Sequence, residues 1–269
     1  MNSLNSPIFI GGMMKSGTSL LRVLLGKHPN IFASYETHWF DLHLHQNGGS
    51  EPAPREKWLR ELYDVPECDF EQLKLDATSA EDFLDRFMTY CTRRAGKRRW
   101  VEKTPDNIRH LSRIWDFWPD AKVIHVRRDL RDIFASWKKN KKGTLAQFLQ
   151  IAKTTYQEIG ELLGTETRRY REVSYECLVR QTRSAMQAVL DFVGEAWAPG
   201  MDRNDTANFE YERVKAVVGV HSATAISLKK PIFTDSVGQW RKMLTQTEAA
   251  QIETQLRPFW MAPEETVAL

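Results

Sequence analysis

The chain has 269 residues, of which 42% are hydrophobic and 11% aromatic, a composition that excludes an intrinsically disordered protein. Its 38 lysines and arginines against 35 aspartates and glutamates give a net charge of +3, too small to indicate a nucleic-acid-binding protein. The three cysteines, Cys68, Cys91 and Cys177, lack metal-site spacing and favour a reducing compartment over a disulfide framework.

Membrane signals are absent from the sequence. The first predicted strand starts at Pro7, which leaves no room for a signal peptide or anchor before it. Later apolar stretches are short, and even "LLRVLL" is interrupted by Arg22. The sequence therefore predicts a cytoplasmic protein without a membrane span.

Short apolar strands alternate with helical patterns along the chain. Strands are predicted at residues 7–12, 30–36, 99–105, 122–128 and 170–176. Helices are predicted at residues 18–29, 79–94, 105–118 and 129–139, and a last one is opened by a capping box from Thr245 to Glu248. The alternation predicts an α/β fold in which helices flank a central parallel sheet.

Two irregular stretches stand outside this alternation. Residues 41–78 are rich in glycine, proline and charge, and they predict an insertion over the sheet edge that serves as a substrate lid. Residues 199–240 are similarly irregular. Because no linker or repeat divides the chain, we expect a single domain over residues 1–269.

The first strand leads into a loop that resembles a phosphate-binding loop. Gly12 and Gly17 have the glycine spacing of the Walker A pattern, but Lys15 precedes the second glycine instead of following it. A strand-loop-helix turn directs backbone N–H groups and the positive end of the helix at an anion. We therefore expect residues 12–19 to bind a phosphate, although the usual magnesium ligands are missing.

The fourth predicted strand ends in two arginines. An arginine offers a planar fork of donors that suits phosphate, so Arg128 is expected to make a second anion contact near the loop. Neighbouring strand residues point to opposite faces, and Arg127 is therefore interpreted as a solvated or helix-capping charge.

Five motifs follow one another in a familiar order. They are "KSGTSLL", "YETHWF", "VEKTP", "KVIHVRRDLRDIFASW" and "VSYECLV", within residues 7–194. In this order the chain resembles the sulfotransferases that use 3′-phosphoadenosine 5′-phosphosulfate (PAPS), and "ETHWFD" is similar to a stretch of the heparan-type branch. The resemblance implies a P-loop-like sulfotransferase fold, with PAPS as the sulfuryl donor, 3′-phosphoadenosine 5′-phosphate (PAP) as the product and no metal.

The resemblance also implies roles for single residues. In the reaction, Lys15 and Lys103 balance negative charge, and Glu36 is the general base, its pKa open to being raised by burial. His38 is the rival base, or else a structural histidine. The residues matching the family's donor-binding positions are Lys15, Ser16, Gly17, Thr18, Ser19, Arg128, Ser136 and Tyr175. A late loop near residues 219–241 is expected to close the donor site through Lys230 and Gly238.

The acceptor is left open by the sequence. It is expected to be a hydroxyl or amine of a small molecule or glycan. The candidates for its pocket, which core packing explains equally well, are Trp39, Phe40, His43, His45, Trp58 and Trp100. Two other functions also stay open, a P-loop nucleotide or sugar kinase with unusual magnesium ligation and a non-catalytic nucleotide-binding protein.

Overall fold

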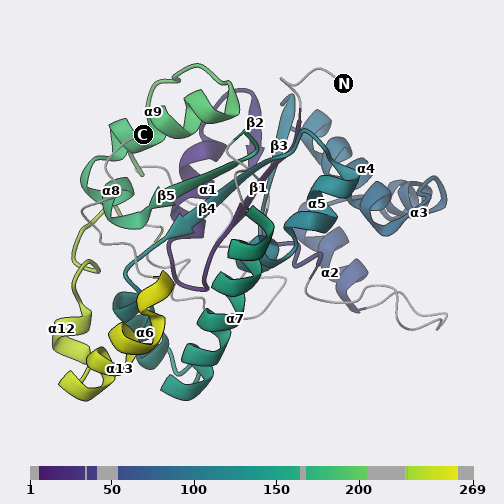
Figure 1. The fold of residues 1–269 in the computed structure, drawn as a ribbon. Helices are drawn as coiled ribbons and strands as arrows, with labels where there is room; N and C mark the ends of the chain where they lie inside the picture. The colour runs from purple at the N-terminus through teal and green to yellow at the C-terminus, as the bar shows by residue number, and fades with distance from the viewer. Residues whose placement is uncertain are drawn as a thin grey trace.

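A computed structural model describes residues 6–33, 35–40, 54–163, 168–204, 228 and 230–259 of the chain. Five strands form one sheet, in which every hydrogen-bonded pair is parallel. The strands are β1 (Ile8–Gly11), β2 (Ile31–Ala33), β3 (Arg99–Lys103), β4 (Lys122–Arg127) and β5 (Tyr170–Ser174), in the spatial order β2-β3-β1-β4-β5 (Figure 1). The predicted parallel α/β sheet is confirmed.

The residues of each strand alternate between two hydrophobic clusters, one on each face of the sheet. On β1, Phe9 packs into one cluster, whereas Ile8 and Ile10 pack into the other. On β4, Val123 and Ile124 divide in the same way. Both faces are therefore apolar, and both are covered by helices, as a parallel sheet requires.

Helices α1 (Thr18–Gly26), α8 (Tyr175–Arg180) and α9 (Thr182–Val193) cover the face of Ile8 and Ile10. The opposite face is covered mainly by α4 (Ala80–Arg94), α5 (Leu111–Phe117) and α7 (Leu145–Leu163). Helix α6 (Leu130–Lys139) follows β4, and α12 (Trp240–Met243), α13 (Gln246–Leu256) and the short 3₁₀ helix η3 (Arg257–Phe259) lie near it (Figure 1).

Capping residues begin two helices where the sequence predicts. The Ser79 hydroxyl accepts a hydrogen bond from the N–H of Asp82 at the start of α4, and Thr245 and Glu248 form the full capping box of α13. The helix predicted over residues 105–118 is instead divided. A 3₁₀ turn, η2 (Pro105–Arg109), ends at His110, whose φ of −120° interrupts the helix before α5.

The stretch from residue 41 to residue 78 is only partly described. Residues 41–53 lie outside the described residues, and the rest forms α2 (Pro54–Tyr63), α3 (Glu67–Leu75) and the turn before α4. Tyr63 packs on Phe32 of the edge strand β2, with ring centroids 6.4 Å apart, and its hydroxyl donates to the carbonyl of Tyr35. The helical part therefore lies at the predicted sheet edge, and the lid function stays a prediction.

The cysteines and the helix lengths complete the description. Cys68, Cys91 and Cys177 are free thiols, and burial raises the pKa of Cys91 to about 12. No helix in the described ranges combines the length and the apolarity needed to cross a membrane.

Candidate active site

The loop between β1 and α1 is held by backbone contacts on both sides. The N–H of Gly12 donates to the carbonyl of Pro105 over 2.8 Å, and the indole N–H of Trp137 donates to the carbonyl of Met14 over 3.0 Å. Gly17, which caps α1, has a φ of +109°, and a Cβ there would lie 2.3 Å from the ring of Tyr175. Only glycine allows this close approach of loop and ring.

Two polar atoms near this loop are buried without a hydrogen-bond partner in the described structure. They are the Oγ of Ser16 and the Nε of Arg128. Buried polar atoms are normally paired, so each of these atoms is suited to a ligand oxygen. The loop also carries Lys15, whose backbone has a positive φ of 80°. Burial lowers the pKa of Lys15, and the nearby positive charge of Lys142 lowers it further.

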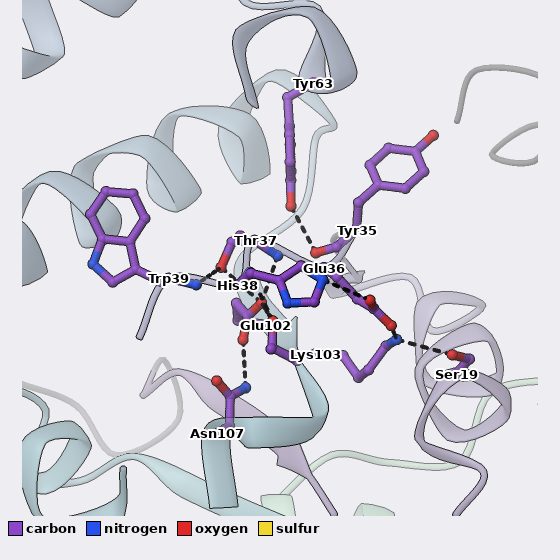
Figure 2. Close-up of polar contacts among 11 residues, drawn as sticks. Ser19, Tyr35, Glu36, Thr37, His38, Trp39, Tyr63, Glu102, Lys103 and Asn107 are labelled. Atoms are coloured by element: carbon purple, nitrogen blue, oxygen red, sulfur yellow. Dashed lines mark hydrogen bonds and ion pairs between the residues drawn. The ribbon is translucent and has the colours of Figure 1, made fainter. Parts of the chain in front are cut away.

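Glu36 lies between a lysine and a histidine, directly after β2 leaves the sheet (Figure 2). Its Oε1 accepts a hydrogen bond from the Nζ of Lys103, which also donates to the Oγ of Ser19 over 2.9 Å. Its Oε2 lies 3.0 Å from the Nε2 of His38. The side chain of Lys103 is 2% exposed, whereas those of Glu36 and His38 are 36% and 35% exposed. The cluster is therefore buried at Lys103 and accessible to solvent at Glu36 and His38.

Charge pairing sets the protonation of this cluster. Burial acts to raise the pKa of Glu36, but the charge of Lys103 and the hydrogen bond and charge of His38 outweigh it and hold the pKa well below its usual value. The expectation of a raised pKa is therefore wrong. Burial lowers the pKa of Lys103, and the charge of Glu36 opposes that shift.

Arg128 reaches the loop from the end of β4. Its guanidinium donates to the carbonyl of Lys15 over 3.0 Å and to the carbonyl of Ser236 over 2.6 Å, and it lies 4.3 Å from the ring centroid of Tyr175. The hydroxyls of Tyr175 and Ser236 are 2.6 Å apart. Ser236 of the late segment therefore contacts both Arg128 and Tyr175, and the closing of a donor site by this segment stays a prediction.

The amino-acid sequence over residues 7–199 matches the family model described as "Sulfotransferase family". This chain belongs to the sulfotransferase family. The family suggested by the five sequence motifs is therefore confirmed.

Curated relatives are distant and longer than this chain. An uncharacterized protein of Aquifex aeolicus is 24% identical over 257 residues, which cover 88% of this chain and 30% of the relative. Protein-tyrosine sulfotransferase 2 of Gallus gallus is 23% identical over 264 residues, which cover 87% of this chain and 62% of the relative. This chain thus spans between about a third and two thirds of these two relatives.

Two solved structures share the fold of this chain over nearly its whole length. The sulfotransferase domain of the Synechococcus PCC 7002 olefin synthase has a TM-score of 0.68 at 21% identity, covering 96% of this chain and 97% of the domain. The sulfotransferase domain of the curacin biosynthetic pathway has a TM-score of 0.61 at 19% identity, covering 94% and 98%. The P-loop-like sulfotransferase fold predicted from the sequence is therefore confirmed.

The remaining donor-site candidates have hydrogen-bond partners within the chain. Ser136 lies on α6, where its Oγ and carbonyl accept from the side chain of Asn140, and no described hydrogen bond joins it to Arg128. The N–H of Gly238 donates to the buried carboxylate of Asp132 over 2.7 Å. The carbonyl of Lys230 accepts from Asn204, and its side chain is exposed. Their roles in donor binding stay predictions, and residues 205–227 and 229 lie outside the described residues.

Arg127 differs from its interpretation as a solvated charge, although it does contact the end of a helix. It does point away from Arg128, but its side chain is only 16% exposed because it pairs with Glu172 over 3.1 Å. A second guanidinium nitrogen donates to the carbonyl of Phe259 over 2.6 Å. Arg127 is therefore part of a buried ion pair that holds the end of η3.

Most candidates for the acceptor pocket belong to the core. Trp39, Phe40 and Trp100 are buried in the cluster of Phe9, and Trp58 packs against it. His43 and His45 lie outside the described residues. Core packing therefore accounts for the aromatic residues among these candidates.

Sequence reasoning missed three residues that shape the site. Glu102 of β3 is fully buried, Asp132 of α6 anchors the late segment, and Ser236 bonds to both Arg128 and Tyr175. Only Glu102 carries a signal in the sequence, since a carboxylate in the middle of an apolar strand calls for buried hydrogen-bond partners.

Proposed function

We propose that this chain transfers a sulfuryl group from PAPS to a hydroxyl or amine of a small-molecule or glycan acceptor. The observation that carries the proposal is the position of Lys103, whose Nζ joins Ser19 at the start of α1 to the carboxylate of Glu36. Ligands of open parallel sheets bind at the carboxyl ends of the strands, where this cluster lies. Membership of the sulfotransferase family supports the same reaction.

The residues around the loop fit the phosphate groups of PAPS. The unpaired Oγ of Ser16 and the first turn of α1, including Thr18 and Ser19, offer donors to a 5′-phosphate. The unpaired Nε of Arg128 suits the 3′-phosphate, with Ser136 of α6 as the family's second contact. In this proposal the ring of Tyr175 borders the same site through its contact with Gly17.

When bound, PAPS supplies the sulfuryl group and leaves as PAP. The buried ammonium of Lys103 and that of Lys15 stabilise negative charge that develops at the loop, because such charges act strongly away from water. Glu36 takes the proton of the acceptor. Its low pKa keeps it ionised at neutral pH but also makes it a weaker base, and its 36% exposure lets an acceptor approach. His38, 3.0 Å from Glu36, is the alternative proton acceptor.

Calorimetric titration of PAP in the absence of Mg²⁺ tests the donor site. We expect micromolar binding by the wild type, and a loss of at least tenfold in affinity for Lys15→Ala and for Arg128→Ala, since each removes a charged partner of phosphate. Arg86→Ala is the matched control, because Arg86 forms an exposed pair with Asp82 on α4 and its loss should leave the affinity unchanged.

The alternatives give different results in the same experiment. Binding of ATP with Mg²⁺ and not of PAP would replace the proposal with the kinase. Tight PAP binding without turnover of labelled PAPS, over a panel of phenol, sugar and amine acceptors, would support the non-catalytic nucleotide-binding protein.

A further inference from the structure

The segment that carries Glu36 and His38 is held by side chains instead of a β-ladder. Pairing between β2 and β3 ends at Ala33 and Val101. Beyond it, three consecutive backbone N–H groups donate to side-chain oxygens (Figure 2). Thr37 donates to Glu102 over 3.0 Å, His38 to Thr104 over 3.0 Å and Trp39 to the hydroxyl of Thr37 over 3.2 Å.

The carboxylate of Glu102 is the centre of these contacts. Besides the Thr37 N–H, its Oε1 accepts from the hydroxyls of Thr37 and Thr104 over 2.9 and 2.8 Å. Its Oε2 accepts from the amide of Asn107, which also donates to the carbonyl of Ile10 over 3.2 Å. Each oxygen that receives an N–H of the segment is therefore Glu102 itself or a hydroxyl that Glu102 holds.

The position of Glu102 separates its role from that of Lys103. Neighbouring residues of β3 point to opposite faces of the sheet. Lys103 reaches α1 on one face and contacts the side chain of Glu36, whereas Glu102 accepts hydrogen bonds from the backbone N–H and the hydroxyl of Thr37. Thr37 lies between Glu36 and His38 in the chain. Fixing the position of Thr37 therefore also fixes the backbone positions from which the side chains of Glu36 and His38 extend.

The centre of this network is a fully buried acidic side chain. Burying a carboxylate is costly, and burial raises the pKa of Glu102 in spite of the four hydrogen bonds that it accepts. The network also supports His38 in a conformation with a φ of +52°, which residues other than glycine rarely adopt. Strain of this kind persists where the surrounding contacts fix the backbone, and it is common at active sites.

We propose that Glu102 is a positioning residue for sulfuryl transfer, which sets the places of Glu36 and His38 through Thr37 and Thr104 without contacting either side chain. The inference rests on the proposed function, because it assigns a role within that reaction. In this proposal proton transfer and donor binding depend on different residues. Glu102 affects proton transfer, and the loop binds the donor.

Two variants of Glu102 test this role. Glu102→Leu removes every acceptor, and we expect kcat to fall about 100-fold, because a small misplacement of a catalytic group costs about that factor. Glu102→Gln keeps one carbonyl oxygen for the two threonines, so kcat should stay within about tenfold of the wild type. PAP affinity should change less than threefold in both. Hydrogen exchange of the amides of residues 37–39 should speed up in Glu102→Leu and much less in Glu102→Gln.

A second pair of variants covers the case in which Glu102→Leu does not fold. Thr104→Val removes the acceptor of the His38 N–H while keeping the side-chain shape, and kcat should fall about tenfold with PAP affinity unchanged. Thr104→Ser keeps the hydroxyl and should restore kcat to near the wild-type value.

The outcomes separate this inference from the proposed function. Wild-type kcat in a folded Glu102→Leu or Thr104→Val chain would overturn the positioning role alone. So would a parallel loss of kcat, PAP affinity and thermal stability, which indicates a general structural role. A wild type that neither binds PAP nor turns over PAPS would overturn the proposed function and this inference with it.

Discussion

Two polar clusters on the same sheet have similar chemistry and different settings. The loop-side cluster consists of Lys15, Glu36, His38 and Lys103, and the tail-side cluster consists of His125, Arg127, Tyr170 and Glu172. In each cluster a carboxylate lies beside a cation and a histidine. In each, burial acts to raise the pKa of that carboxylate and the partners outweigh it.

The settings differ in exposure and in place along the strands. His125 lies inside β4 and is fully buried, with its Nδ1 2.6 Å from the hydroxyl of Tyr170. Glu36 and His38 follow the end of β2 and remain about one third exposed. A shifted pKa therefore marks both clusters, and only position at the carboxyl ends of the strands, with access from outside, distinguishes a candidate active site from a buried ion pair.

Removing the carboxylate from each cluster is the most direct test of the difference between them. We expect Glu36→Gln to lower kcat about 100-fold or more, the usual size of a general-base contribution. Glu172→Gln should leave kcat within about threefold, because Glu172 pairs with Arg127 on the other face from Arg128. Steady-state turnover of labelled PAPS measures both. If His38→Asn has the larger effect, the role of base passes to His38.

A pair of glycines tests the loop itself. Gly17→Ala places a Cβ 2.3 Å from the ring of Tyr175 at a φ that alanine disfavours, so PAP affinity should fall about tenfold and stability about 1–3 kcal/mol. Gly160→Ala, on α7, meets no atom and should stabilise the chain by about 0.5–1 kcal/mol. Calorimetry measures the affinity for PAP, and urea unfolding measures the change in stability. Equal PAP affinity in Gly17→Ala would contradict the tight packing of the loop on Tyr175.

The smallest expected effect is the contribution of the ion pair between Glu172 and Arg127 to the stability of the fold. Burial acts to raise the pKa of Glu172, but the hydrogen bonds and charges of His125 and Arg127 bring it to about 2, from an ordinary 4.5. Burial lowers the pKa of His125, so Arg127 carries the permanent charge. A lowered pKa stabilises the fold at pH values above 4.5, and this contribution is lost as pH falls from 4.5 toward 2.

Urea unfolding of Glu172→Gln at several pH values measures this contribution. The variant should be less stable than the wild type by about 1–2 kcal/mol at pH 7, and the difference should shrink below pH 4.5. Glu67→Gln is the control, since Glu67 is 75% exposed and its ion pair should contribute little. A difference that does not change with pH would remove the ion pair as its cause.

Local pattern was enough to predict most of the fold. Apolar runs located all five strands, and capping residues located the starts of α4 and α13. The second strand ends earlier than predicted, because the backbone after Ala33 turns to the side chains of Glu102 and Thr104. No pattern within residues 30–36 shows partners that lie about seventy residues away.

The motifs named candidate site residues, whose roles stay predictions, and they did not show the partners that come from distant parts of the sequence. The alternation of a strand correctly placed Arg127 and Arg128 on opposite sides, but the partner that buries Arg127 lies on the next strand. Burial of Glu36 suggested a raised pKa, and the charge of Lys103, brought near by the sheet, reversed the direction. The donor-binding roles of Ser136, Lys230 and Gly238 remain predictions.

The order of the strands also affects how this chain folds during synthesis. Strand β1 is made first and lies in the middle of the sheet, where its partners are Val101 to Lys103 on one side and Lys122 to His125 on the other. Its apolar residues, Ile8 to Ile10, therefore have no strand partner until Val101 to Lys103 are made, 93 residues later, and their second partner strand follows 114 residues after Ile8. Pairing between strands so far apart in the sequence is slow, and it leaves apolar, aggregation-prone segments exposed to solvent in the meantime. The strand that leads into the proposed donor-binding loop is thus the one most in need of protection before the fold is complete.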